Sequence, residues 1–173
     1  MAPTSQPASN PMVTMETSMG MVKIELFKDQ TPLTVENFLK LAREGFYDGV
    51  IFHRVIPNFM AQTGDPNSKD ADPYNDGTGG PGYTFNDELV KNLSNVRGTM
   101  SMANRGPNTN GSQFFINIVD NTFLDGRHAV FGKVIEGLDI VDKIVNVPTR
   151  KDDPRLKDRP VKDVKIIKVS IAN

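Results

Sequence analysis

Alternating apolar and polar residues predict a strand near the start of the chain and a helix directly after it. In the segment 21–26, MVKIEL, apolar residues alternate with Lys and Glu, which is the two-residue period of a half-buried strand. Thr31 stands where a helix N-cap is expected, with Pro32 at the first helical position. Apolar residues then recur at helical spacing over 35–42, and Gly45 follows. We therefore predict an amphipathic helix that begins after Thr31 and ends at Gly45.

Strands are expected to dominate the rest of the chain. Short apolar stretches separated by Gly, Pro and Asn clusters predict six further strands, over 50–56, 59–63, 96–102, 113–119, 129–135 and 161–171. A second short helix fits 138–145, where Leu138, Val141 and Val145 share one side. Many short strands with two helices favour a closed or sandwiched antiparallel sheet whose open ends are covered by the helices.

The two ends of the hydrophobic pattern define one domain. Residues 1–11, MAPTSQPASNP, carry no charge and nothing large to bury, so we expect a disordered tail there, followed by a single domain over 12–173. Within that domain the stretch 65–82, DPNSKDADPYNDGTGGPG, is too long and polar for a simple turn. Long loops in compact domains are often functional, so this segment is a candidate for part of a site.

The composition excludes several kinds of chemistry. The 173 residues contain no Cys and two His, which excludes disulfides, thiolate nucleophiles, Cys-ligated zinc and three-His metal sites. Lys and Arg number 20 against 21 Asp and Glu, a net charge of -1, so no general cationic field favours nucleic acid or anionic lipid. No apolar run approaches the roughly 20 residues of a membrane span, and no secretory signal pattern is present. We expect a cytoplasmic protein without metal or cofactor.

The predicted strand 113–119 has an unusual outer face. Alternation places Phe115 on the same face as the amides of Gln113 and Asn117, while Phe114 and Ile116 share the opposite face. An aromatic ring between two amides suits a groove that binds an amide-containing ligand, which needs apolar contact and a few placed hydrogen bonds. The alternative is that Phe115 fills an ordinary second layer of core, and alternation alone leaves both readings open.

Two charged or titratable residues have a similar ambiguity. Arg54 lies among apolar neighbours, where a guanidinium is costly unless it is paired or lines a wet cleft. A structural ion pair and a functional cation are both consistent with that position. His128 is either a satisfied, half-buried histidine or a catalytic one.

Three short motif matches are not supported by the residues around them. The run 77–82, GTGGPG, satisfies a dinucleotide-binding pattern literally, but no strand precedes it and no helix follows. The acidic residues of 70–76 lack the Gly that a calcium-binding EF-hand turn requires. Asp87 and Glu88 are adjacent, so in an extended segment they point to opposite faces and cannot form the acid/base pair of a glycosidase.

Four longer blocks carry a resemblance to a known family. They are FHRVIPNFMAQTGDP over 52–66, SMAN over 101–104, GPNTNGSQFFI over 106–116 and LDGRHAVFGKV over 124–134. In their order and spacing they resemble the cyclophilin family of peptidyl-prolyl cis/trans isomerases, and the similarity extends over about 12–171. The resemblance implies a closed eight-stranded antiparallel barrel capped by two α-helices. It also implies an enzyme that accelerates rotation about Xaa-Pro bonds in peptides and in unfolded or folding proteins, with a monomer as the default state.

The same motifs place an expected active site on this sequence. The residues with expected catalytic roles are Arg54, Gln62, Asn104 and His128, and those expected to bind the peptide are Phe59, Met60, Gly77, Ala103, Gln113, Phe115, Phe123 and Leu124. Phe123 stands where many family members have Trp, and the chain contains no Trp. The missing indole N–H removes a hydrogen-bond donor, so we expect weak binding of cyclosporin with turnover preserved. A non-catalytic module that only docks proline-containing peptides is the alternative, since it needs the same pocket without Arg54.

Overall fold

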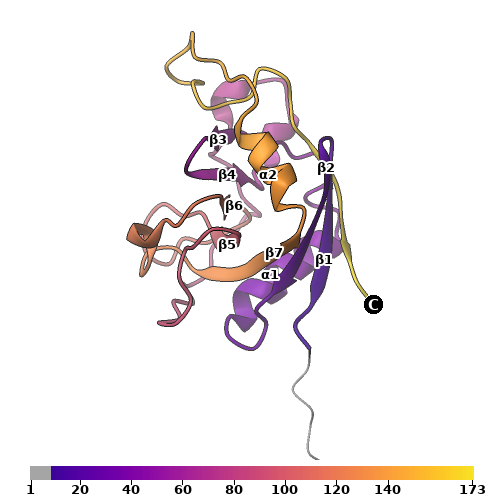
Figure 1. Ribbon diagram of the computed structural model, residues 1–173, viewed down its shortest axis with the longest axis vertical. Coiled ribbons are helices and arrows are strands. Elements are labelled where there is room, and N and C mark those ends of the chain that lie inside the picture. The colour runs from indigo at the N-terminus through magenta and orange to yellow at the C-terminus, as the bar shows by residue number, and fades with distance from the viewer. Residues whose placement is uncertain (1–8) are drawn as a thin grey trace, which may run out of the picture.

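The computed structural model describes residues 9–173, which form eight strands, two α-helices and three short 3-10 helices (Figure 1). The strands are β1 (Met12–Thr17), β2 (Gly20–Leu26), β3 (Arg54–Ile56), β4 (Met60–Thr63), β5 (Thr99–Met102), β6 (Phe114–Asn117), β7 (Val130–Glu136) and β8 (Ile166–Ile171). The helices are α1 (Pro32–Arg43) and α2 (Leu138–Val145), with 3-10 turns η1 (Pro66–Lys69), η2 (Pro73–Asn75) and η3 (Thr122–Leu124). Both predicted helices are confirmed, α2 residue for residue.

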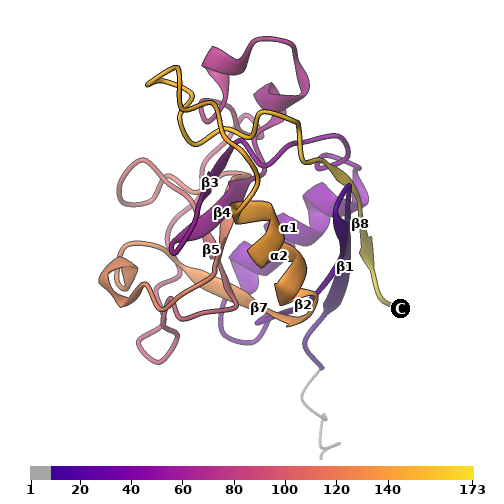
Figure 2. The ribbon, with the colours of Figure 1, turned by 45° about the horizontal axis from the view of Figure 1, so that its top comes forward.

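All eight strands join one antiparallel sheet in the order β3-β4-β6-β5-β7-β2-β1-β8. The predicted antiparallel sheet is confirmed, but the predicted closure is wrong: β3 and β8 are the two edges and do not pair. The chain beside these edges meets at a single bridge between Ile51 and Lys165, flanked by backbone bonds such as Phe52 N to Val164 O at 2.9 Å. These bonds join the segment before β3 to the first residue of β8 and the residues before it, and the sheet curls into an open half-barrel (Figure 2).

The core lies inside this curled sheet, between its concave face and the helices. Alternate residues of β2 are fully buried, as the pattern predicts, and α1 adds the apolar face that contains Phe38. The Phe38 ring centroid lies 5.1 Å from Tyr47, 5.4 Å from Phe114 and 5.8 Å from Phe131. Burying side chains of this size contributes roughly 1.5–3 kcal/mol each, so this aromatic cluster attaches α1 to the sheet. The second helix, α2, lies beside β2, β3 and β4 (Figure 2).

The start of α1 is capped from a distant part of the chain. Thr31 occupies the predicted N-cap position, but its hydroxyl donates to Phe27 O at 3.0 Å and does not cap the helix. The Glu88 carboxylate accepts instead from the N–H groups of Leu33 and Thr34, at 3.2 and 2.6 Å. A carboxylate satisfies the free N–H groups of a helix start and complements its dipole. Glu88 therefore has a structural role at α1.

The first strand, β1, was not expected from the pattern. It pairs with both β2 and β8, and its Val13, Met15 and Thr17 side chains are buried. Of the expected tail, residues 1–8 lie outside the described residues. Asn10 donates to Glu25 Oε1 at 2.8 Å, and Pro11 O accepts from the backbone of β2 at 2.9 Å. Asn10 and Pro11 are therefore bonded to the domain, which begins before the predicted boundary at Met12.

Candidate active site

Strand register brings the predicted polar residues into one row on the outer face of the sheet. Arg54 on β3 pairs with Gln62 on β4, and Gln62 pairs with Phe115 on β6. Directly opposite residues of antiparallel strands point to the same face. Phe114 and Ile116 belong to the core, so the row lies on the side away from it. The predicted alternation of the strand 113–119 is confirmed, because Phe114 and Ile116 join the core cluster and Phe115 and Asn117 do not. Phe115 and Asn117 are nevertheless buried, at 4% and 0% exposed.

A chain of hydrogen bonds connects this row to the long loop. The Arg54 Nη1 atom lies 3.4 Å from Gln62 Oε1, and Gln62 Nε2 donates to Gln113 Oε1 at 3.0 Å. Gln113 Nε2 then donates to the carbonyl of Gly79 at 2.9 Å. Within residues 9–173 no carboxylate forms an ion pair with Arg54, whose side chain is exposed. The guanidinium is therefore oriented by an amide and keeps most of its N–H groups for another partner.

His128 forms part of the wall beside this row. Its ring lies edge-on to Phe115, with centroids 5.4 Å apart. The Nδ1 atom lies 2.8 Å from Met102 O. Because a carbonyl oxygen can only accept, Nδ1 carries a proton, and Nε2 is the acceptor of the neutral ring. The ring is thus held in one tautomer by the backbone of β5.

The side chain of Asn104 organises the neighbouring loops. Its Nδ2 donates to Arg127 O at 2.7 Å, and its Oδ1 accepts from Gly106 N at 3.2 Å. Both ends of the amide are therefore used within the protein. The second N–H of the Asn104 NH₂ group and the Asn104 backbone are the parts left for contact with a peptide.

Further apolar residues of the expected site lie at the start of β4 and in η3. The rings of Phe59 and Phe123 stack at 5.9 Å with an interplanar angle of 30°. Phe123 is 67% exposed, Leu124 is half-buried and Met60 is buried. Pattern reasoning missed Asn121, which donates to Phe59 O at 3.0 Å and so links η3 to the turn before β4. An Asn directly before a short helical turn is the signal that identifies such a residue.

Two grooves lie on either side of Gln62. One, of about 590 Å³, is bounded by the glycine-rich loop 77–84 and by Ala103, Asn104 and Gln113. The other, of about 570 Å³, lies between Arg54, the segment 73–77 and the segment 154–159. Gly77 lines both grooves, whereas Phe59, Phe123 and Leu124 line neither. Met60, Phe115 and His128 line neither groove either, so the grooves border Gln62 and Arg54 but not the apolar residues of the expected site.

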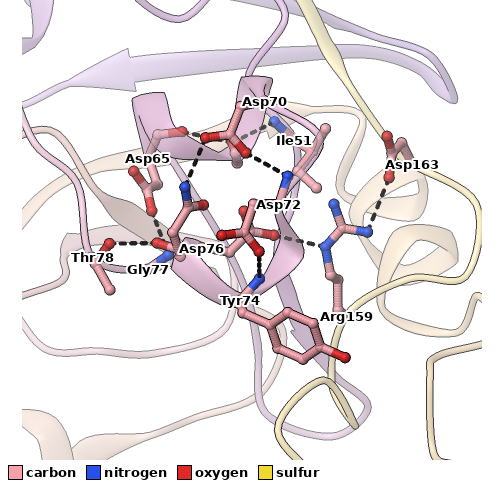
Figure 3. Close-up of polar contacts among 12 residues, drawn as sticks. Ile51, Asp65, Asp70, Asp72, Tyr74, Asp76, Gly77, Thr78, Arg159 and Asp163 are labelled. Carbon is pink, nitrogen blue, oxygen red and sulfur yellow. Dashed lines mark hydrogen bonds and ion pairs between the residues drawn. The ribbon is translucent and has the colours of Figure 1, made fainter. Parts of the chain in front are cut away.

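Charges beneath the second groove are paired or neutral. Arg159 Nε lies 2.7 Å from Asp76 Oδ2, and both side chains are buried (Figure 3). Burial raises the pKa of Asp76 even though Arg159 opposes that shift. Burial also lowers the pKa of His53 to about 4, so this imidazole is neutral at pH 7. Neither the ion pair across 83 positions nor the burial of His53 was predicted from the sequence.

The fold and the site define a class of protein, and comparison with known proteins agrees. The sequence profile described as cyclophilin type peptidyl-prolyl cis-trans isomerase/CLD matches residues 12–171. The chain belongs to the cyclophilin family and is a peptidyl-prolyl cis-trans isomerase. No helix within residues 9–173 combines the length and apolar character that crossing a membrane requires.

Individual relatives cover almost the whole chain. Peptidyl-prolyl cis-trans isomerase-like 1 of Emericella nidulans is 44% identical over 92% of this chain and 93% of its own length. Peptidyl-prolyl cis-trans isomerase CYP71 of Arabidopsis thaliana is 48% identical over 92% of this chain, which spans 24% of that longer protein. Two crystal structures of a Cryptosporidium parvum cyclophilin-type isomerase are 36% identical. For one of them the TM-score is 0.85, and the match covers 95% of this chain and 98% of the crystallised chain. The other was solved in the presence of the dipeptide Ala-Pro; its TM-score is 0.84, and the match covers 94% of this chain and 99% of the crystallised chain.

Proposed function

We propose that the isomerase holds the proline ring of its substrate against an apolar surface while Arg54 donates a hydrogen bond to the proline nitrogen. The surface consists of Phe59, Met60, Phe115 and Leu124, with His128 and Phe123 along its wall. One observation carries the proposal: an exposed guanidinium without a carboxylate partner in residues 9–173 lies in the same row as Phe115. The Cryptosporidium parvum relative solved with Ala-Pro supports a proline-containing peptide as the ligand.

The energetics of the reaction suit this arrangement. Twisting an Xaa-Pro bond sacrifices amide resonance, a barrier of about 20 kcal/mol. Raising the rate from about 10⁻² to about 10³ s⁻¹ requires about 7 kcal/mol of preferential transition-state binding. As the bond twists, the proline nitrogen becomes pyramidal and regains its lone pair. A hydrogen bond from Arg54 to that lone pair forms only near the transition state, so it accelerates the rotation selectively.

The amides of the site hold the rest of the peptide. Gln62 and Gln113 each use one N–H of their NH₂ group inside the protein, so the second N–H of each is free to donate to a peptide carbonyl. The backbone of Asn104 supplies a further contact. The Gly77 and Ala103 positions leave room for the peptide because neither carries a large side chain.

An Arg54→Ala variant tests the proposal directly. We expect it to bind an Ala-Pro peptide with affinity close to that of the wild type but to lose most of its acceleration of cis/trans exchange, measured by exchange NMR. Arg54→Lys is the control, because it keeps the charge without the planar fork of donors. Undiminished exchange in Arg54→Ala overturns the mechanism.

The weak binding of cyclosporin remains a proposal of its own. Phe123 is exposed and stacked on Phe59, and it has no N–H. We expect Phe123→Trp to tighten cyclosporin binding, measured by calorimetry, and to leave peptide turnover within about twofold of the wild type.

A further inference from the structure

The hydrogen-bond chain that reaches Arg54 has a direction, and the carbonyl of Gly79 determines it. A carbonyl can only accept, so Gln113 turns its NH₂ group toward Gly79 and leaves its oxygen for Gln62. Gln62 consequently turns its NH₂ group toward Gln113 and presents its own oxygen to Arg54. Reversing either amide would bring two oxygens or two N–H groups together. The position of Gly79 therefore decides which end of Gln62 meets the guanidinium.

Asp65 holds the turn that contains Gly79. Its carboxylate is fully buried, just after β4, and accepts a hydrogen bond from Asn67 N at 2.8 Å. It also accepts from Gly77 N (Figure 3). A methyl group added to Gly79 would collide with Asp65 Oδ1, so the Gly79 backbone packs directly on the carboxylate. One buried side chain thus binds the start of the long loop and its glycine turn at the same time.

Other contacts also hold the two ends of the turn, and the Asn67 side chain lies against Gly79 beside Asp65. Asp76, the residue before Gly77, is paired with buried Arg159. Thr78 accepts from Asn67 Nδ2 at 3.0 Å. These bonds limit the movement of the loop, but in the described part of the chain the Asp65 carboxylate is the charged group that Gly79 itself packs against.

We propose that Asp65 is a positioning residue of the isomerase, acting through Gly79 and Gln113 on the orientation of Gln62 and Arg54. The inference rests on the proposed role of Arg54. A buried aspartate at this place also has a simpler role, because it caps η1. The structure offers a matched residue with only that simpler role.

Asp72 is this matched residue. It precedes Pro73 as Asp65 precedes Pro66, and its carboxylate accepts from Tyr74 N at 3.0 Å, as Asp65 accepts from Asn67 N. Asp72 is exposed, and no hydrogen bond connects it to the 77–79 turn. If a turn cap in this loop were enough to affect catalysis, kcat should fall in both variants, even though loss of the buried Asp65 cap costs more stability than loss of the exposed Asp72 cap.

The first experiment compares Asp65→Asn with Asp72→Asn. The Asp65 carboxylate accepts hydrogen bonds from the backbone N–H groups of Asn67 and Gly77. In Asp65→Asn the side-chain NH₂ group faces one of these two donors and cannot accept from it, so one hydrogen bond is lost. We expect kcat for an Ala-Pro peptide to fall about tenfold, with KM changed less than about twofold, because a misplaced Arg54 affects the transition state more than binding. The Gln113 side-chain NH₂ signals should shift in the ¹H–¹⁵N spectrum. Asp72→Asn should change neither quantity.

A second variant at position 65 and a double-mutant cycle with Gln113 distinguish a positioning role of Asp65 from a role in folding. Asp65→Ser keeps an oxygen to cap η1 but lacks the second oxygen for Gly77, and it should show the same loss of kcat. Gln113→Glu replaces the NH₂ group that donates to Gly79 O with an oxygen, so it breaks the hydrogen-bond chain between Gly79 and Gln62. Adding Asp65→Asn to this variant should therefore cause no further loss of kcat.

Four outcomes overturn the proposal: wild-type kcat in Asp65→Asn, an equal loss in Asp72→Asn, multiplicative losses in the double variant, or failure of both position-65 variants to fold. An active Arg54→Ala variant would instead overturn the proposed mechanism itself.

Discussion

The buried imidazole of His53 makes a quantitative prediction about stability and pH. His53 is 7% exposed, and its Nδ1 atom has no hydrogen-bond partner among residues 9–173. Burial lowers the pKa of this imidazole from 6.5 to about 4. As pH falls below 6.5, the unfolded chain binds a proton at this position while the folded chain does not. Protonation therefore favours unfolding between about pH 6.5 and pH 4, and the contribution becomes constant below pH 4.

The size of the effect follows from the two pKa values. With 6.5 in the unfolded chain and about 4 in the folded one, linkage gives a loss of about 2 kcal/mol at pH 5 and about 3 kcal/mol at pH 4, relative to pH 7. His53→Gln removes this titration and leaves the carboxylates in place. Urea unfolding of both proteins at pH 7 and pH 5 isolates the difference, because the other groups contribute equally to each.

We expect the wild type to lose about 2 kcal/mol more than His53→Gln on going from pH 7 to pH 5. The variant will have its own lower or higher stability at pH 7 from altered packing, and that offset does not affect the comparison. Equal losses in the two proteins would show that the folded state binds the proton on His53 as readily as the unfolded chain, and that burial does not lower the pKa of this imidazole.

Two further substitutions test structural features. Glu88→Ala removes the carboxylate that caps α1, so the free energy of unfolding from thermal denaturation should fall by about 1 kcal/mol. Glu44 is exposed, and Glu44→Ala serves as the control; its free energy of unfolding should change by less than about 0.5 kcal/mol. An equal effect at both positions would contradict the capping role. Gly137→Ala places a methyl group at φ +90, in collision with Met21 O, and should cost about 2–4 kcal/mol in urea unfolding. Gly49→Ala, at φ +83 with no atom within 4 Å of the added carbon, should cost about 1 kcal/mol; similar losses would show that backbone strain alone matters.

The spacing of apolar residues predicted a helix or strand correctly where that spacing was regular along the segment. The apolar repeat over 138–145 predicted α2 at its observed bounds, and alternation predicted which residues of β6 face the core. The start of β8 was placed at Val161, which is 57% exposed, whereas the strand begins at Ile166. β1 was missed because its alternation of Val13, Met15 and Thr17 follows directly on the Pro-rich segment.

For the site, the sequence motifs identified the residues but not how they are held. The register that aligns Arg54, Gln62 and Phe115 depends on which strands become neighbours, and β4 pairs with a strand some fifty positions further along the chain. The resemblance also led to the expectation of a closed barrel, whereas only the folded chain shows that β3 and β8 do not pair.

Local patterns were enough to predict the helices, most of the strands and the alternation of β6, because each depends on residues close together along the chain. The family followed from four motif blocks spread over 52–134. The partners of Glu88, Asp65 and Arg159 and the burial of His53 came from the folded chain alone. Hydrogen bonds, ion pairs and burial depend on distances between segments that are remote in sequence, and those distances exist only once the sheet has curled around its core.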